Sequence, residues 1–148
     1  MAGLHEEIEC MENYIQLMNM RQHEMIKLSH TLSGLSHDLQ IMRFLLQPLC
    51  ENAIQHGMKP GEALHIRLIG KMEGSDVVFT LENDGEMIPP EQVEQLNSNM
   101  QHSRNAQGIG LMNIAARLTL NYGPTAGMQL ISKDGKTQVV MRFPAKKA

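Results

Sequence analysis

Apolar residues near the start of the chain recur with the spacing of an amphipathic helix. These residues are Leu4, Ile8, Met11, Ile15 and Met18. Acidic residues fill the other faces of this segment, and they suit its first half because a helix N-terminus carries partial positive charge. They are Glu6, Glu7, Glu9 and Glu12. The pattern predicts a helix of about five turns.

Alternation of side chains marks two pairs of segments as β-strands. The first pair is residues 64–68 and 77–81, and the second is residues 128–132 and 137–143. Glu73-Gly74 lies between the first two segments, and Asp134-Gly135, which is typical of tight hairpin turns, lies between the second two. The sequence therefore predicts two hairpins, the first with one buried face.

Residues 42–56 carry an apolar stripe, and Gly57 is placed to end the helix that this stripe predicts. The stripe consists of Leu46, Leu49, Cys50 and Ala53. Pro48 lacks a backbone N–H, so we expect a kink or an adjusted first turn there. A further helix is predicted from Leu111 until Gly123 stops it, and Gly108 and Gly110 precede it.

The remaining segments are short. Pro89-Pro90 opens a predicted helix that runs to Leu96. Residues 97–107 have the polar, aperiodic sequence of a mobile loop. A short strand is predicted over residues 25–29. Because helices and strands do not alternate strictly, we expect an α+β fold. The specific expectation is a two-layer α/β sandwich, whose mixed, mostly antiparallel sheet is covered on one face by helices.

Composition and charge exclude several classes of protein. The 148 residues suit one domain, and 13 basic against 16 acidic residues exclude a broadly polycationic surface for nucleic acid. No apolar run reaches the roughly 18 to 20 residues that span a bilayer. Cys10 and Cys50 lie in different predicted helices, so we expect neither a disulfide framework nor a metal knuckle.

Three segments offer polar groups for chemistry. In the first, Glu51, Asn52, Gln55 and His56 share the face opposite the apolar stripe. A carboxylate beside an amide oxygen suits Mg²⁺, which completes its coordination shell with water and substrate phosphates. The alternative is an ordinary solvated helix face.

The second segment follows the predicted strand that ends near Leu81. Asn83 or Asp84 can face a ligand there, with Met87 and Ile88 lining a pocket beside it. The alternative is an ordinary turn, because Asn-Asp-Gly is a common turn sequence. The third segment, Gly108-Ile109-Gly110, precedes a helix whose free N–H groups can bind phosphate. Two glycines before a helix are also common for structural reasons, and neither familiar phosphate-loop motif is present.

Taken together, the three segments resemble the catalytic domain of LytS-type sensor histidine kinases, and the similarity covers nearly the whole chain. The matching residues are Leu46 to Gly57, Glu82 to Gly85, Gly108 to Ile114, Arg117-Leu118 and Tyr122-Gly123. The resemblance implies the Bergerat ATP-binding fold that gyrase, heat-shock chaperones and mismatch-repair ATPases share.

The resemblance also implies roles for individual residues. Asn52 corresponds to the Mg²⁺ ligand that bridges the metal to the ATP phosphates, Glu51 to a carboxylate that acts as base, and His56 to a position beside the phosphates. The other implied ATP-binding positions are Asn83, Gly85, Ile88, Gly108, Gly110, Leu111 and Thr137.

The chain departs from the family pattern at three of its positions. Asn83 stands where the family has an Asp that binds the adenine amino group, Met87 where a glycine is common, and Gln55 where a Lys is frequent. The family's phosphoacceptor segment has no counterpart here. We therefore expect residues 1–22 to be a helix leading from a missing phosphoacceptor region, and residues 23–148 to be the catalytic domain.

The expected activity is that of a protein-histidine kinase, which transfers the γ-phosphoryl group of ATP to a histidine on the absent segment. The implied partners are that segment, a response-regulator receiver domain and a second copy in a homodimer, but no nucleic acid. The implied location is the cytoplasmic side of a membrane-anchored bacterial protein. One alternative is a nucleotide-binding regulatory module without phosphotransfer. A dimer-closing ATPase is disfavoured because no transducer domain is present.

Overall fold

The computed structural model describes residues 1–22, 25–36, 38–102 and 109–147. Its helices are α1 (Leu4–Gln22), α2 (Leu46–Gly57), α3 (Pro90–His102) and α4 (Ile109–Tyr122). Its long strands are β2 (Ile26–Ser33), β4 (Leu64–Glu73), β5 (Asp76–Asn83), β6 (Gly127–Lys133) and β7 (Lys136–Pro144). Its short strands are β1 (Ala2–Gly3), β3 (Leu39–Ile41) and β8 (Lys146–Lys147).

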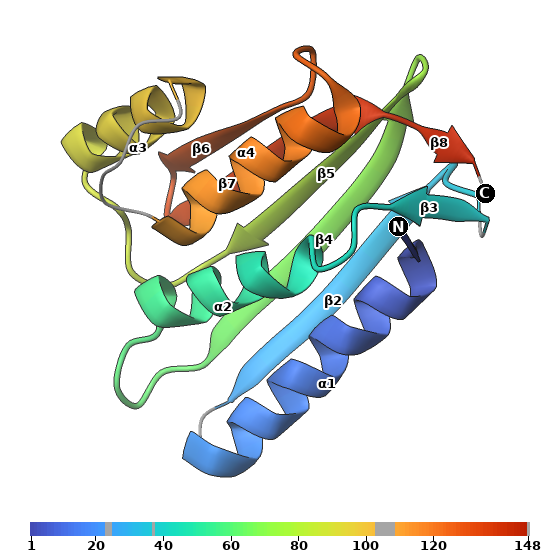
Figure 1. Cartoon of the computed structure of the whole chain (residues 1–148). Coiled ribbons are helices and arrows are strands. Elements are labelled where there is room, and N and C mark those ends of the chain that lie inside the picture. Colours follow the sequence, from blue (N-terminus) through green and yellow to red (C-terminus); the bar gives the residue numbers. More distant parts are fainter. Residues whose placement is uncertain (23–24, 37, 103–108, 148) are drawn as a thin grey trace.

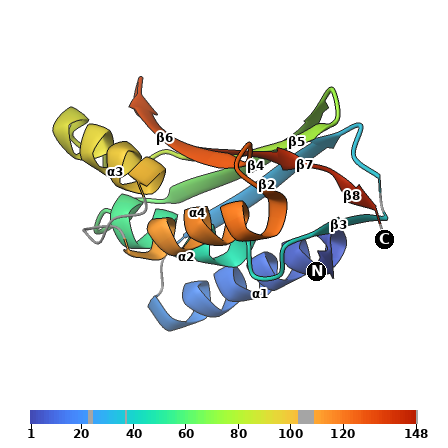
Figure 2. The same ribbon diagram turned by 45° about the horizontal axis from the view of Figure 1, so that its top comes forward.

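The long strands form one twisted sheet in the order β2-β4-β5-β7-β6. Strands β2 and β4 are parallel, whereas every other neighbouring pair is antiparallel. Helices α1, α2 and α4 lie on one face of the sheet, and α3 packs beside edge strand β6 (Figures 1 and 2). The predicted α+β sandwich with helices on one sheet face is therefore confirmed.

The core lies between the sheet and these helices. Alternate residues of β4, β5 and β7 point toward the helices and are buried, among them Leu68, Phe79 and Met141. Residues of α1 join the same core, since Ile8 and Met11 are buried against it. The first helix is thus packed on the sheet, while the predicted division at residue 22 stays a prediction.

Both predicted hairpins are confirmed. The turn between β6 and β7 has positive φ angles at Asp134 (55°) and Gly135 (77°), the combination that a tight two-residue hairpin turn requires. This turn fixes the register in which Ser132 lies opposite Thr137. In the other hairpin, Gly74 has a φ of 64°.

Several predicted boundaries are wrong. Helix α2 begins at Leu46 rather than at residue 42, which places Pro48 in the first turn, where its missing N–H costs no helical bond. Helix α3 continues through residues 97–102, where a loop was expected, and residues 103–107 of that loop lie outside the described residues. Helix α4 begins at Ile109, so Gly110 lies inside its first turn.

Other differences concern short strands and one acidic residue. Strand β2 extends to Ser33, beyond the predicted residues 25–29, and the three short strands were not predicted. Glu7 was expected on a polar helix face, yet only 3% of it is exposed.

Each edge strand of the main sheet is capped by an asparagine side chain from a neighbouring helix. Asn19 of α1 accepts from the Ile26 N–H at 2.8 Å and donates to the Ile26 carbonyl at 3.0 Å. Asn97 of α3 accepts from the Leu130 N–H at 2.7 Å and donates to the Leu130 carbonyl at 2.9 Å. These side chains fasten α1 to β2 and α3 to β6.

Candidate functional site

Helix α2 carries the first group of predicted site residues. Its apolar stripe is buried in the core, whereas Glu51 and Asn52 are half-buried and His56 is exposed. The Glu51 carboxylate accepts a hydrogen bond from the Gln47 side chain at 3.2 Å. Within the described part of the chain, the Asn52 side chain makes no hydrogen bond.

The end of α2 is in contact with the turn that follows β5, through two glycines. A Cβ on Gly57 would lie 2.8 Å from Nδ2 of Asn83, and a Cβ on Gly85 would overlap the Gly57 carbonyl. Gly85 also has a φ of 111°, which glycine adopts most readily. The Glu86 N–H donates to the same carbonyl at 3.1 Å. Because these backbones touch, Asn83 lies beside the end of α2.

The second group of predicted residues lies around Asn83, which is 7% exposed. Its Nδ2 donates to the Asp84 carbonyl at 2.8 Å, and its Oδ1 accepts no hydrogen bond from the residues that the structure describes. Across the sheet Asn83 pairs with Thr137. The Thr137 hydroxyl lies 3.4 Å from that of Ser132, which also accepts from the Ile88 N–H at 3.3 Å.

Ser132 is a candidate site residue that the sequence did not indicate, although it joins two predicted positions, Ile88 and Thr137. The signal that could have found it is the Asp134-Gly135 turn, because that turn places Ser132 opposite Thr137. Next to this group, a hollow of about 460 Å³ opens between α3 and β6. Its lining residues are Pro90, Val93, Glu94, Asn97, Ser98 and Ser132.

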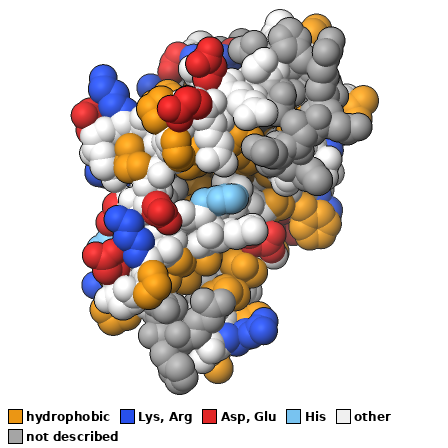
Figure 3. All heavy atoms as spheres, turned by 90° about the vertical axis from the view of Figure 1, so that its left-hand side faces the viewer, with side chains coloured by type: hydrophobic (Ala, Val, Ile, Leu, Met, Phe, Trp, Pro, Cys, Tyr) orange, Lys and Arg blue, Asp and Glu red, His pale blue; other side chains and the backbone are white. Residues whose placement is uncertain are grey.

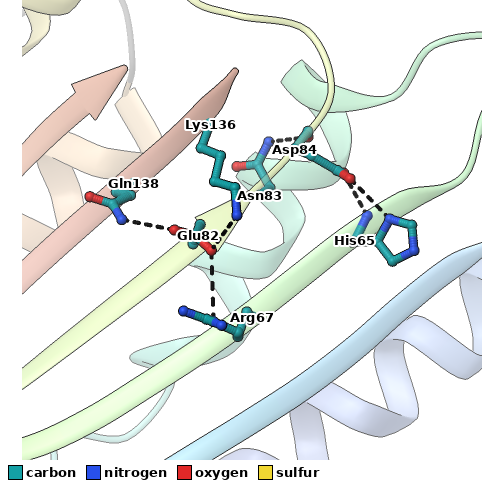
Figure 4. A network of polar contacts seen from close by, with 7 residues as sticks. All are labelled: His65, Arg67, Glu82, Asn83, Asp84, Lys136 and Gln138. Atoms are coloured by element: carbon teal, nitrogen blue, oxygen red, sulfur yellow. Dashed lines mark hydrogen bonds and ion pairs between the residues drawn. The ribbon is translucent and has the colours of Figure 1, made fainter. Parts of the chain in front are cut away.

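Asp84, the alternative ligand-facing residue, is used differently. Its carboxylate accepts from the His65 backbone N–H at 2.7 Å and lies 2.9 Å from the His65 ring nitrogen Nδ1 (Figure 4). The backbone N–H of Asp84 donates to the His65 carbonyl at 3.2 Å. Asp84 therefore clamps the end of β5 to β4, and Asn83 is the better placed of the two to face a ligand.

Glu82 anchors the same strand end on the open face of the sheet (Figure 4). Its carboxylate accepts from Gln138 at 2.9 Å and lies 3.5 Å from Lys136 and 3.7 Å from Arg67. Burial acts to raise the pKa of Glu82, but the Gln138 hydrogen bond and the charges of Lys136 and Arg67 outweigh it and lower the pKa. Glu82 is thus a charged structural residue.

The third group lies at the start of α4. Among the described residues, a Cβ on Gly110 would meet no atom within 4 Å outside the backbone of α4. Leu111 is buried in the core, so it offers its backbone rather than its side chain to a ligand. Gly108 lies outside the described residues. The start of α4 and the end of α2 lie on the same side of the molecule (Figure 1), the side that Figure 3 presents, where hydrophobic side chains are visible between polar ones.

Glu51 and Asn52 fit a magnesium ion only together with a phosphate ligand. Within the described residues, no cluster of three or more His, Cys, Asp or Glu side chains forms a metal site. Glu51 and Asn52 supply one carboxylate and one amide, and Mg²⁺ commonly takes its other ligands from phosphate and water. Burial and the nearby Glu51 raise the pKa of the Cys50 thiol to about 12, so this thiol stays protonated at neutral pH.

Within the described ranges, no helix has both the length and the apolar character needed to cross a membrane. The structure brings the α2 residues and the Asn83–Thr137 group together through Gly57 and Gly85. Their roles toward a ligand stay predictions.

Comparisons with known proteins give the following similarities. Residues 37–147 match the family of histidine kinase-, DNA gyrase B- and HSP90-like ATPases. The sensor histidine kinase YesM of Bacillus subtilis is 28% identical over 145 residues, which are 97% of this chain and 24% of YesM. The sensor protein LytS of Staphylococcus saprophyticus is 27% identical over 144 residues, 96% of this chain and 24% of LytS. The chain thus spans about a quarter of these relatives.

Solved structures show the same fold. The catalytic domain of histidine kinase ThkA superposes with a TM-score of 0.67 at 15% identity, covering 99% of this chain and 96% of that domain. Histidine kinase AdeS of Acinetobacter baumannii gives 0.66 at 14% identity, with 97% and 65% covered. ThkA in complex with the response regulator protein TrrA gives 0.62 at 14% identity, with 96% and 40% covered.

Proposed function

The chain belongs to the family of histidine kinase-, DNA gyrase B- and HSP90-like ATPases, and we propose that it is the ATP-binding catalytic domain of a LytS-type sensor histidine kinase. The observation that carries the proposal is the contact between Gly57 and Gly85. It brings the C-terminal end of α2, the helix that carries Asn52, beside the buried Asn83 at the end of β5. A metal-binding end and a base-binding end then belong to one site.

In this proposal Asn83 recognises the adenine. Its Oδ1 accepts from the adenine amino group, since its Nδ2 is already engaged by the Asp84 carbonyl. Thr137 and Ile88 line the same end, and Gly85 allows the turn to approach α2. Met87 borders this end, because its sulfur lies 3.8 Å from the Ser132 hydroxyl, and 37% of its surface is exposed.

The phosphates lie at the other end, where Asn52 binds Mg²⁺ and His56 lies beside them. The ion supplies charge neutralisation for the phosphate oxygens when it is bound. Backbone N–H groups at Gly110 and Leu111 face phosphate at the positive end of α4. In this arrangement Gly110 lacks a side chain so that phosphate can approach the helix. Packing among the described residues does not require a glycine, because none of their atoms outside the α4 backbone lies within 4 Å of where a Cβ would be.

The proposed reaction transfers one phosphoryl group. An imidazole nitrogen of the acceptor histidine forms a bond to the γ-phosphorus, the bond from that phosphorus to the bridging oxygen breaks, and ADP leaves. Glu51 accepts the proton that the imidazole ring releases. We expect this to raise the reaction rate by only about 100-fold, because most of the rate enhancement in phosphoryl transfer comes from positioning.

The partners and location follow from the relatives and are proposals. They are an upstream segment with the acceptor histidine, a response-regulator receiver domain, and a second copy in a homodimer. We place the domain on the cytoplasmic side of a membrane-anchored protein, with residues 1–22 leading from the acceptor segment into residues 23–148.

The decisive test supplies the acceptor separately. The chain alone is expected to bind ATP with Mg²⁺ but to incorporate no acid-labile phosphate from radiolabelled ATP. Addition of an acceptor helix from a LytS-type kinase is expected to yield phosphohistidine slowly, because the tether that normally supplies a millimolar effective concentration is missing. Strong labelling of the chain alone would mean that one of its own seven histidines is the acceptor.

The second candidate is a nucleotide-binding regulatory module without phosphotransfer, and the residues that favour it are Asn83 and Met87. The same assay separates the two functions. Confirmed ATP binding with no labelling of any supplied acceptor would favour the regulatory module.

Replacing Asn83 with aspartate tests the adenine end. A carboxylate makes a stronger, charge-assisted bond to the adenine amino group, so ATP affinity is expected to rise by about three- to tenfold. The free energy of unfolding is expected to fall by about 1 to 3 kcal/mol, because the Asp84 carbonyl loses its donor. Calorimetric titration and urea unfolding measure the two effects. Unchanged ATP affinity would place the adenine elsewhere.

A further inference from the structure

Helix α2 begins without a cap of its own. The residue at its N-cap position, Leu45, has helical angles (φ −86°, ψ −49°) and makes no side-chain cap hydrogen bond, and the first turn contains no acidic residue. The first N–H groups of a helix have no partner inside the helix and carry its positive partial charge. In a buried position they require an acceptor from elsewhere.

That acceptor is Glu7, which lies 38 residues before Leu45 on α1. One carboxylate oxygen accepts from the Leu45 N–H at 2.9 Å and lies 3.5 Å from the Leu46 nitrogen, and the other accepts from the Phe44 N–H at 3.2 Å. With 3% of its surface exposed, Glu7 is almost completely removed from water. A buried carboxylate of α1 thus holds the start of α2.

Helix α4 holds the same turn from its other side. The Tyr122 hydroxyl accepts from the Met42 N–H at 2.8 Å, and the Arg117 guanidinium donates to the carbonyls of Arg43 and Phe44. Phe44 has a φ of 58°, an unfavourable conformation for a residue with a large side chain. Such a conformation persists only where several contacts enforce it, so the start of α2 is a fixed point.

We propose that Glu7 is a positioning residue for the nucleotide site, an inference that rests on the proposed ATP-binding function. Helix α2 is held by Glu7 at its start and by the Gly57–Glu86 hydrogen bond at its end. Glu51 and Asn52 lie between these two anchors. The adenine end, in contrast, is built on the sheet at Asn83 and Thr137, and Glu7 does not touch it. Loss of Glu7 therefore shifts the metal end and leaves the adenine end in place.

Glu7→Gln tests the inference, because glutamine keeps the shape and one acceptor but loses the charge. Calorimetry would compare binding of ATP with Mg²⁺, ATP with a chelator, and adenosine. Affinity for ATP with Mg²⁺ is expected to fall by about tenfold, while adenosine affinity stays at the wild-type value. Amide hydrogen exchange at residues 44–46 and 51–52 is expected to accelerate in the nucleotide-free variant.

Glu9→Gln is the matched control, since it makes the same change at an exposed position of the same helix. It is expected to bind all three ligands as the wild type does. Should Glu7→Gln fail to fold, Glu7→Asp retains the charge but shortens the reach, and the same split between ligands is expected.

Two results would overturn the inference. Equal losses for adenosine and for ATP with Mg²⁺ would indicate general destabilisation, and unchanged binding of both would show that α2 is positioned without Glu7. If the wild type bound neither ligand, the proposed function would fail, and the inference with it. If the wild type bound ATP but Glu7→Gln did not lose affinity for ATP with Mg²⁺ more than for adenosine, only the Glu7 inference would be contradicted.

Discussion

Replacing Asn52 with alanine is expected to abolish the magnesium-dependent part of ATP binding while leaving the fold nearly intact. The Asn52 side chain is half-buried on the polar face of α2, and within the described residues it makes no hydrogen bond that the fold would lose. We expect affinity for ATP with Mg²⁺ to fall by about 100-fold, the scale on which metal sites respond to loss of a ligand or its support. The free energy of unfolding should change by at most about 0.5 kcal/mol.

Calorimetric titration with a non-hydrolysable ATP analogue measures this effect, with and without Mg²⁺. Asn13→Ala is the control, because it makes the same change at an exposed position of helix α1. It is expected to retain affinity within a small factor. An Asn52→Ala variant that binds the analogue as tightly as the wild type would remove Asn52 from the site.

Changing Gly110 to valine is expected to damage nucleotide binding without damaging the protein. No atom of the described residues outside the α4 backbone lies within 4 Å of a Cβ at this position, and valine is a better helix former than glycine, so stability should rise by a few tenths of a kcal/mol. Phosphate affinity depends on close approach to the first N–H groups of α4, which a branched side chain blocks. We expect ATP affinity to fall by at least about 30-fold, the upper end of anion effects at helix termini.

Gly127→Val provides the comparison, because a Cβ on Gly127 also meets no atom within 4 Å but lies on edge strand β6. It is expected to leave ATP affinity unchanged. Thermal melts and titrations of both variants separate stability from binding. If Gly110→Val kept its affinity and lost melting temperature, the glycine would be structural and the phosphate-binding role of this helix start would be wrong.

The elements that the sequence predicts well are those whose structure depends only on residues close to them in the chain. The alternation at residues 64–68 and the Asp134-Gly135 turn are local signals, and both hairpins form as expected. The amphipathic pattern of the first segment likewise yields α1. For the same reason, the polar face of α2 could be identified from side-chain spacing alone.

The start of α2 could not be predicted, because its cause lies elsewhere in the chain. The hydrophobic pattern continues back to Met42, but the turn at Phe44 and the carboxylate of Glu7 delay the helix to Leu46. Helical periodicity places Glu7 among polar residues and carries no sign that its partners are backbone groups of a distant turn.

The two ends of the site were predicted separately, and their contact was not. Gly57 was expected only to stop a helix, and Gly85 only to serve a turn or a ligand. In the structure the Gly57 carbonyl occupies the space that a Cβ on Gly85 would need, and the Asn83 side chain lies 2.8 Å from where a Cβ on Gly57 would be. Ser132 was missed for a related reason, since only the pairing of β6 with β7 places it beside Thr137.

The asparagine caps on β2 and β6 also bear on how the chain behaves among its own copies. An edge strand with free backbone groups invites strand addition by another molecule, the first step of sheet-based aggregation. At Ile26 and Leu130, both backbone groups are already bonded to Asn19 and Asn97. An incoming strand would have to displace an amide and move a helix at each place. These two side chains therefore hinder strand addition at Ile26 and Leu130, a task separate from any ligand.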